Sequence, residues 1–250
     1  MKILMLNYEF PPVGGGAGNA CYYLLREFAK RKIAVDLVTS SPDKYKEERF
    51  SSTIRIFRLD VGKKSMHYWT FPEMLRWSIK ADRMIARLGR YDLCHAFFGW
   101  PCGVIAYRTG LPYIISLRGS DVPGHNPRFR LLDKLLFSHL SRLVWKNAKV
   151  VVTNSEGLKI RALHTYQREI KVIPNGIDTD MFKPGKMRKS SEELRIVSVG
   201  RLNIIKGYQY LIKALEGIPE TSLTLIGDGN QAEYLKDLAK KLHVSVTFKG

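Results

Sequence analysis

The chain has 250 residues, of which 45% are hydrophobic and 26% charged, and 41 Lys and Arg against 23 Asp and Glu leave a formal net charge of +18. This composition is typical of a globular protein and excludes an acidic disordered chain, and the lack of a run of about 18 uncharged apolar residues excludes a membrane-spanning helix. The basic excess is compatible with nucleic acid, an anionic membrane surface or a phosphorylated small substrate as partner, or with a solvated surface that has no specific partner.

Short β-branched strands alternate with helical patterns over the first 173 residues. The expected strands are Ile3–Tyr8, Val35–Thr39, Ile54–Leu59, Asp92–Ala96, Tyr113–Leu117, Lys149–Thr153 and Lys171–Ile173. The expected helices span 18–32, 72–88, 129–145 and a segment that starts at Ser155. Because Ile54–Leu59 alternates apolar and mostly basic residues, we expect this strand to be half-exposed near a sheet edge. The alternation predicts an α/β fold with a parallel, doubly wound sheet and helices on both faces.

The pattern lapses over Pro174–Glu193, where Pro, Gly and polar residues suit a linker. A strand–helix–strand–helix–strand pattern follows over 195–248, which is one mononucleotide-binding half of a doubly wound fold. We therefore predict an N-terminal Rossmann-like domain over 1–180, a linker over 181–193 and a partial C-terminal domain over 194–250. A unit of this size buries only ~60% of its unfolded surface, so the sequence looks unfinished.

A glycine-rich loop, Gly14–Gly18, lies between the first strand and the first helix. Consecutive glycines let the backbone approach a ligand, and the N-terminus of the following helix favours an anion. The loop matches neither the dinucleotide fingerprint nor the phosphate loop of ATPases. Both an anion site and a flexible tight turn therefore remain open at this point.

Three further motifs follow strands of the first domain. Arg118–Asp121 combines a cation, a flexible glycine, a hydroxyl and a carboxylate, which suits either a grip on a sugar or phosphate or a capped turn. His95 ends a strand, where a histidine is more often hydrogen-bonded structure than a catalyst. Asn175-Gly176 is an ordinary turn pair.

Two basic segments carry further hypotheses. Arg201 and Lys206 lie between a strand and a helix of the second unit, where a guanidinium and an ammonium can clamp a diphosphate, although two solvated cations fit the spacing equally well. The segment Phe129–Trp145 interleaves apolar residues with Arg, Lys and His. It suits either an anionic membrane surface or ordinary packing on the sheet, and packing is the interpretation we favour.

In this order the motifs closely resemble the retaining GT-B glycosyltransferases of family GT4, the group 1 glycosyltransferases. The resemblance covers essentially the whole chain, and its most specific segments are 174–184 and 200–207. It rests on the glycine loop and on Asp92–Ala96, Leu117–Asp121, Val172–Pro184, Val199–Gly207, Leu225–Gly229 and Val246–Gly250.

The resemblance implies a transferase that moves a sugar from a nucleotide diphosphate sugar to a sugar, lipid-linked or small-molecule acceptor. It implies retention of anomeric configuration, and neither a metal nor another cofactor. Arg201 and Lys206 would neutralise the leaving diphosphate, where charge develops in the transition state. Gly15 and Gly16 would approach the donor phosphates from the other domain.

Four residues of the first domain receive roles by the same resemblance. Asp121 and Arg118 are the candidate catalytic residues, close to the transferred sugar or the acceptor. His95 and Asn175 are expected on the substrate side. Many relatives have a histidine where Phe97 stands and another where Arg118 stands, and the change at Arg118 indicates a different acceptor or sugar contact.

The paired-glutamate motif with which the family holds the nucleotide ribose and the donor sugar lies beyond Gly250. We therefore expect a C-terminally truncated enzyme, inactive as the 250-residue chain alone. The alternative hypothesis is a non-catalytic binding or regulatory protein that retains part of the fold. Nucleic-acid binding is disfavoured because no binding module is recognisable.

The three cysteines indicate where the protein works. Cys21, Cys94 and Cys102 cannot all pair within the chain, and their spacing fits no zinc motif. This favours a reducing, cytoplasmic setting. A peripheral contact with the anionic inner face of the membrane is our interpretation of the charge that a nucleotide diphosphate leaves unassigned.

Overall fold

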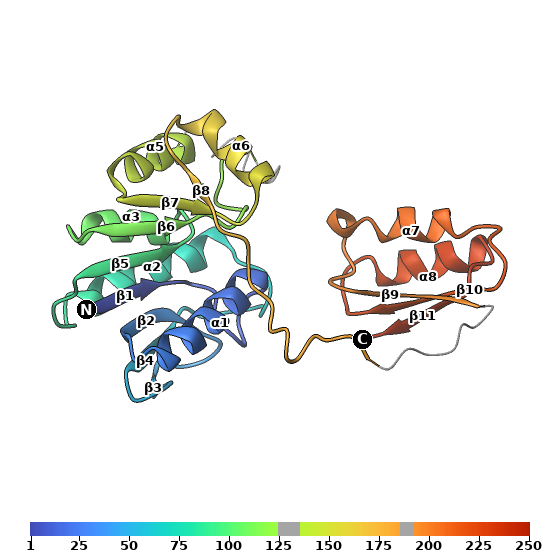
Figure 1. The fold of residues 1–250 in the computed structure, drawn as a ribbon, viewed down its shortest axis with the longest axis horizontal. Coiled ribbons are helices and arrows are strands. Elements are labelled where there is room, and N and C mark those ends of the chain that lie inside the picture. Colours follow the sequence, from blue (N-terminus) through green and yellow to red (C-terminus); the bar gives the residue numbers. More distant parts are fainter. Residues whose placement is uncertain (125–135, 186–192) are drawn as a thin grey trace. The chain divides into compact units, whose positions relative to one another are not determined.

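The computed structural model describes residues 1–124, 136–185 and 193–250, which form two compact units, Met1–Asp178 and Thr179–Gly250. In the N-terminal unit, eight strands form one sheet in the order β3-β4-β2-β1-β5-β6-β7-β8 (Figure 1). All neighbouring strands are parallel except β3 and β4. The strands are β1 (Lys2–Leu6), β2 (Ala34–Ser41), β3 (Lys46–Arg49), β4 (Ile54–Asp60), β5 (Leu93–Phe97), β6 (Tyr113–Ser116), β7 (Val150–Thr153) and β8 (Lys171–Val172).

Helices cover both faces of this sheet, as the sequence predicts. Helix α1 lies on one face, whereas α2, α3 and α5 lie on the other (Figure 1). Right-handed crossovers explain the difference, because the chain moves in one direction along the sheet from β1 to β2 and in the other from β4 onward. The helices are α1 (Gly16–Lys30), α2 (Phe71–Ile85), α3 (Cys102–Arg108), α5 (Ser138–Asn147) and α6 (Glu156–Thr165).

The core lies at the centre of the sheet, where strands are buried from both sides. Leu4, Met5 and Leu6 of β1 are fully buried, as expected for parallel strands between two helical layers. Asp36 of β2 is the notable charge in this core. Burial alone would raise its pKa, but hydrogen bonds from Arg55, Tyr91 and Lys2 outweigh that effect and lower the pKa to about 2.

The prediction of a half-exposed strand at 54–59 is wrong, although its position next to the sheet edge is right. Ile54, Ile56, Phe57 and Leu59 are all buried, and Arg58 is 9% exposed. Strand β3, which the sequence analysis did not predict, covers this side and supplies Glu48, which Arg58 contacts at 2.8 Å. A basic alternation therefore marks an ion-paired strand here and not a solvated one.

Three other segments differ from expectation or lie outside the described residues. Helix α3 was not predicted, because it is short and follows a Gly-Trp-Pro loop. Of the helix expected at 129–145, residues 129–135 lie outside the described part, and α5 spans Ser138–Asn147. Residues 186–192 of the expected linker also lie outside it.

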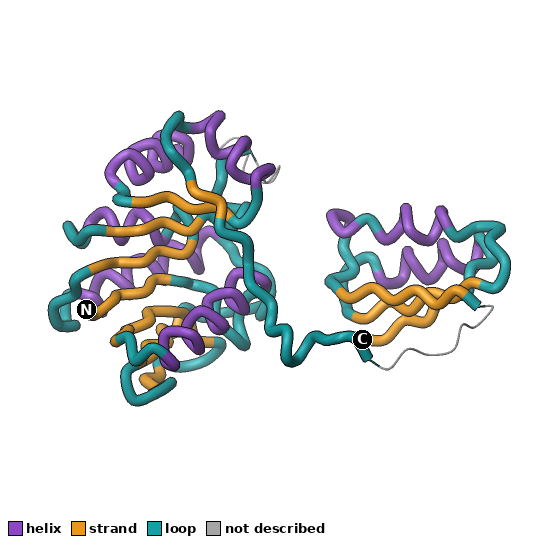
Figure 2. Tube along the Cα trace, in the orientation of Figure 1, coloured by secondary structure: helices purple, strands orange, loops and turns teal. Residues whose placement is uncertain are grey.

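The C-terminal unit is a three-stranded parallel sheet in the order β11-β10-β9. Both of its α-helices lie on the same side of the strands (Figure 2). Leu223 and Leu225 of the central strand form its buried core together with Ile212 and Leu235 from the helices. The elements are β9 (Leu194–Val199), the 3-10 turn η3 (Ile204–Lys206), α7 (Tyr208–Ala214), β10 (Thr221–Ile226), α8 (Ala232–Lys241) and β11 (Val246–Lys249).

Cys21, Cys94 and Cys102 are buried free thiols. None of the helices built from the described residues is long and apolar enough to cross a bilayer.

Candidate active site

Asp121 organises the carboxyl edge of the N-terminal sheet. Its Oδ1 accepts hydrogen bonds from the backbone N–H groups of Arg118 and Gly119, each at 2.9 Å, and its Oδ2 accepts one from Gly99 at 2.6 Å. Burial raises the pKa of Asp121, and these backbone bonds oppose the rise. Because both oxygens are engaged, the carboxylate holds the loop after β6 against the loop after β5.

The Arg118 side chain is a largely buried cation at this edge. Its Nη1 donates to Asn175 Oδ1 at 2.8 Å, and its guanidinium lies over the Phe97 ring, 4.4 Å from the centroid. Its Nε is buried and has no hydrogen-bond partner among the described residues. Burial lowers the pKa of Arg118, and the nearby Asp121 counteracts this. The structure thus brings together three of the predicted site residues, Arg118, Asp121 and Asn175.

His95 lies beside the same aromatic ring. Its Nε2 is 2.8 Å from Ser116 Oγ, and its ring is 4.9 Å from that of Phe97. Burial and the Arg118 charge lower the pKa of His95 to about 4. The imidazole is therefore neutral at neutral pH and acts through hydrogen bonds. Phe97 was not a candidate, although its position two residues after His95 on a strand places both on one face.

The glycine loop holds an acid that the sequence analysis did not single out. Gly15 precedes the first turn of α1, and its backbone N–H donates to Glu9 Oε2 at 3.3 Å. Gly14 has a φ of +100°, and a Cβ there would lie 2.6 Å from Glu9 Cβ. At Gly15 and Gly16, by contrast, a Cβ would meet nothing within 4 Å. The two glycines are open to a ligand, but a carboxylate already lies at the helix start.

The segment between β4 and α2 closes on this loop. Gly14 donates its N–H to the Met66 carbonyl at 2.6 Å, and His67 Nδ1 is 2.9 Å from the Gly14 carbonyl. These contacts join the glycine loop to the start of α2. No spacing rule predicts them, because the partners are some 50 residues apart.

Arg201 and Lys206 lie on the loop that leaves β9 in the C-terminal unit, and both are exposed. The Lys206 N–H donates to Asn203 Oδ1 at 3.3 Å. The Leu202 N–H donates to the Asp228 carbonyl at 2.8 Å. The loop is thus braced by its own cap and by the loop after β10, so both cations project from a fixed segment at the carboxyl end of a strand.

Within 1–124, 136–185 and 193–250, no group of three His, Cys, Asp or Glu side chains is placed to hold a metal ion. The sequence prediction of metal-free chemistry stays a prediction.

Comparison with known proteins agrees with this architecture. The family model described as Glycosyltransferase Family 4 matches residues 14–181, and the one described as Glycosyl transferases group 1 matches residues 181–250. Among solved structures, sucrose-phosphate synthase from Thermosynechococcus elongatus has a TM-score of 0.80 at 20% identity, over 100% of this chain and 70% of its own. HepE of Anabaena in complex with UDP-glucose has a TM-score of 0.69 at 18% identity, over 100% of this chain and 69% of its own. The fold is therefore part of the GT-B fold of glycosyltransferases.

Curated relatives are consistent with that class. An uncharacterized glycosyltransferase of Methanocaldococcus jannaschii is 28% identical over 100% of this chain and 69% of its own length. Glycogen synthase of Mycobacterium tuberculosis is 26% identical over 98% of this chain and 66% of its own length. The chain belongs to glycosyltransferase family 4, and it spans about two thirds of the length of these relatives.

Proposed function

We propose that the protein transfers a sugar from a nucleotide diphosphate sugar to an acceptor, with retention of anomeric configuration and without a metal. The observation that carries this proposal is the ordered pair of family matches over residues 14–250, with cationic and polar side chains at the strand ends of both units. HepE, which shares the fold, was solved with UDP-glucose bound. A nucleotide diphosphate sugar is thus the donor class best supported.

In this proposal Arg201 and Lys206 bind the donor diphosphate and offset the charge that develops on it as the sugar leaves. A fixed cation near a developing anion is worth more than a solvated one, because no reorganisation is needed at the moment of reaction. Gly15 and Gly16 would let the donor phosphates approach the start of α1. Glu9 would then have to turn away from Gly15, since two anions repel at that distance.

Arg118 and Asp121 have different tasks in this scheme. Asp121 accepts three backbone hydrogen bonds, so it positions the loop and leaves Arg118 to face the reacting sugar or the acceptor. The neutral His95 and Asn175 would contribute hydrogen bonds on the substrate side. The acceptor is a sugar, a lipid-linked molecule or a small molecule, and the reaction takes place in the cytoplasm.

Titration of the 250-residue chain with UDP, GDP and ADP tests the donor site. For the nucleotide that binds, we expect Arg201→Ala and Lys206→Ala each to weaken the diphosphate at least about tenfold, because a charged hydrogen bond contributes about 1.5–3 kcal/mol. The affinity for the matching nucleoside monophosphate should fall less in the same two variants. Lys213 is an exposed cation of α7, and Lys213→Ala is the matched control, which should change neither the diphosphate affinity nor the monophosphate affinity. Unchanged diphosphate affinity in both site variants would contradict the assignment.

A transfer assay tests the expectation that the 250 residues alone are inactive. Nucleotide diphosphate binding with transfer far below family rates is the expected outcome. Transfer at an ordinary rate, on the order of 10 per second, would overturn that expectation. It would not contradict the assignment of the donor site, which the titration tests.

A further inference from the structure

Helix α2 exposes an apolar stripe that the core does not use. Phe71, Leu75 and Ile79 are 37%, 49% and 45% exposed. Their i, i+4, i+8 spacing places them on one face of the helix. The residues that anchor α2 to the sheet lie on another face and include Trp77, which is fully buried. The packing of α2 on the sheet therefore does not depend on this stripe.

Aromatic side chains border the stripe. Phe71 stacks on the half-buried Trp100, with ring centroids 5.6 Å apart and planes 6° from parallel, and Trp100 in turn packs at 4.7 Å on Phe137, which is buried. Tyr107 of the adjacent α3 is 39% exposed. The amphipathic rings of Trp and Tyr favour the boundary between water and hydrocarbon.

A row of cations runs along one side of the stripe. Arg76, Lys80, Arg83 and Arg87 are exposed, and none of them forms an ion pair within the described part of the chain. Arg76 and Lys80 instead donate to backbone carbonyls, those of Val61 at 3.3 Å and Asp60 at 2.6 Å.

Neither acid of α2 neutralises that row. Glu73 is buried against Lys63, and Asp82 pairs with Arg108 of α3 at 3.0 Å. The exposed face of the helix is consequently apolar and cationic.

Three of these four cations also line an open cavity of about 260 Å³ between α2, β4 and the segment after β2. Lys80, Arg83 and Arg87 contribute three positive charges, and Tyr45 adds a phenol. Asp60 is the acid of the lining, and its Oδ1 already accepts the Gly62 N–H at 2.9 Å. The excess of donors and positive charge suits a phosphate group.

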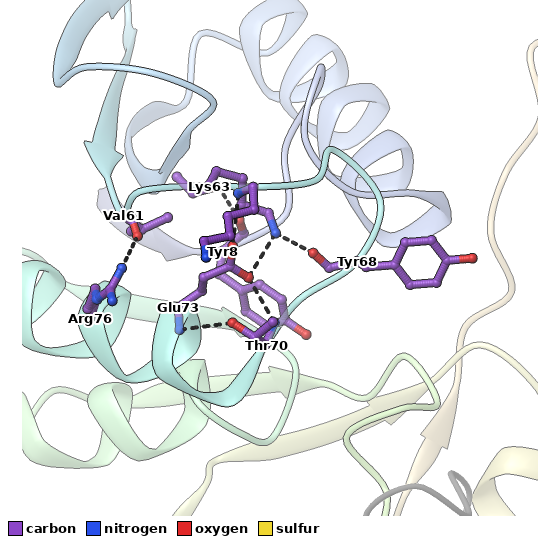
Figure 3. A network of polar contacts seen from close by, with 9 residues as sticks. Tyr8, Val61, Lys63, Tyr68, Thr70, Glu73 and Arg76 are labelled. Carbon is purple, nitrogen blue, oxygen red and sulfur yellow. Dashed lines mark hydrogen bonds and ion pairs between the residues drawn. The ribbon is translucent and has the colours of Figure 1, made fainter.

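The start of α2 is firmly held, so the surface has a defined geometry. Thr70 and Glu73 form a capping box, and Lys63, whose side chain is 1% exposed, contacts Glu73 at 3.1 Å and the Tyr68 carbonyl (Figure 3). The same view shows Arg76 reaching back to Val61. The segment fixed in this way is the one that contacts the glycine loop through Met66 and His67.

We propose that the outer face of α2 docks the protein on an anionic lipid bilayer, with Phe71, Leu75 and Ile79 in the headgroup region and a lipid phosphate at Lys80, Arg83 and Arg87. Charge favours a bilayer over a second copy of this chain, because pairing the face with itself would oppose two rows of cations. The placement differs from the segment 129–145 considered from the sequence. Combined with the proposed function, it would bring the acceptor side of the enzyme to lipid-borne acceptors.

Sedimentation of the 250-residue chain with phosphatidylcholine vesicles, with and without phosphatidylglycerol, tests the proposal. We expect binding only to the anionic vesicles. Arg83→Gln with Arg87→Gln should weaken it about 25-fold, since one cation near such a surface is worth about fivefold. Leu75→Ser with Ile79→Ser should weaken it at least about tenfold, because the apolar contact is lost.

The matched control is Ile160→Ser with Arg161→Gln, which changes the same residue types on α6, where Ile160 is 59% exposed. This control should bind as the parent does. Circular dichroism confirms that each variant folds, and nucleotide diphosphate affinity should be unchanged in all of them, which separates this test from that of the donor site.

Four results would overturn the docking surface. Equal loss in the control would mean general attraction by the +18 chain, and no binding to anionic vesicles would exclude the bilayer as partner. A switch from dimer to monomer in Leu75→Ser with Ile79→Ser, measured by analytical ultracentrifugation, would assign the face to a second copy. If millimolar inorganic phosphate releases the parent from vesicles, and Leu75→Ser with Ile79→Ser binds vesicles as the parent does, the cavity would be assigned to a free anion.

Discussion

The Phe97 ring contacts two side chains that differ in charge, the neutral His95 imidazole and the Arg118 guanidinium. The imidazole bonds to Ser116, and the guanidinium lies over the ring. Asp121 fixes the backbone that carries Arg118 without forming an ion pair with its guanidinium. Burial and the nearby Arg118 charge lower the pKa of His95, so the stability of the protein should depend on pH.

The prediction at this scale concerns His95→Gln, which can keep a hydrogen bond to Ser116. The folded-state pKa of His95 is about 4 against an ordinary 6.5, so the unfolded chain binds a proton that the folded chain refuses. The contribution of His95 to the free energy of unfolding is fully present above pH 6.5 and is lost as the pH falls toward 4. The parent should lose up to about 3 kcal/mol more than His95→Gln over that window.

Urea unfolding followed by tryptophan fluorescence measures this difference. All four tryptophans, Trp69, Trp77, Trp100 and Trp145, belong to the N-terminal unit, so the fluorescence reports its unfolding alone. Parallel pH profiles for parent and variant would show that His95 titrates normally in the folded state.

At the scale of elements, loops with close backbone contacts determine how the strand ends are presented. In the C-terminal unit, a Cβ at Gly229 would lie 2.2 Å from the Leu202 carbonyl oxygen, so only glycine lets the loop after β10 meet the loop that carries Arg201 and Lys206. Gly157 in α6 differs, because a Cβ there would meet nothing within 4 Å.

These two glycines predict opposite effects for the same substitution. Gly229→Ala should destabilise the C-terminal unit by about 1–3 kcal/mol, because the backbone must move to admit the methyl group. Gly157→Ala should stabilise the N-terminal unit by about 0.5–1 kcal/mol, because the unfolded chain loses freedom and the helix loses none. Hydrogen exchange of the β10 amides measures the first change and tryptophan fluorescence the second. Faster exchange in β10 is expected for Gly229→Ala only.

Much of the element pattern could be predicted from sequence, but not all. The strand and helix periods of β1, β2 and α2 are local properties, and the Thr70-x-x-Glu73 capping box also indicates where α2 starts. Strand β3 was not predicted because Lys46–Arg49 is polar on both faces and shows no hydrophobic alternation. The burial of β4 could not be predicted either, since it depends on Glu48 and Asp36 reaching Arg58 and Arg55.

At the scale of the whole molecule, the two units differ in how their sheets are covered. Register places Ile196 and Leu223 on the helix-covered face of the C-terminal sheet, and Val197 and Val199 on the other. These two valines are 64% and 73% exposed, and no helix of the described residues covers them. Parallel sheets are ordinarily covered on both faces, so these two valines are apolar side chains left in contact with water.

We expect Val197→Thr with Val199→Thr to reduce binding of the dye 8-anilinonaphthalene-1-sulfonate and self-association of the chain. Threonine keeps the β-branched shape that strands favour while it removes exposed apolar surface. The stability of the C-terminal unit, measured by hydrogen exchange in β10, should change by less than about 0.5 kcal/mol, as for other surface substitutions. A larger loss would show that the two valines are packed in solution.

The sequence by itself determined the two α/β patterns, the family to which the chain belongs, and the candidate residues at the strand ends, because period and motif order are written along the chain. Their roles, the domain limits at 180, 181–193 and 194, and metal-free transfer stay predictions. The tertiary structure alone decided that Glu9 lies against Gly15, that Phe97 contacts both His95 and Arg118, and that α2 exposes a cationic apolar face. The reason is physical: burial, pKa and pairing depend on which distant segments become neighbours, and no local spacing encodes that.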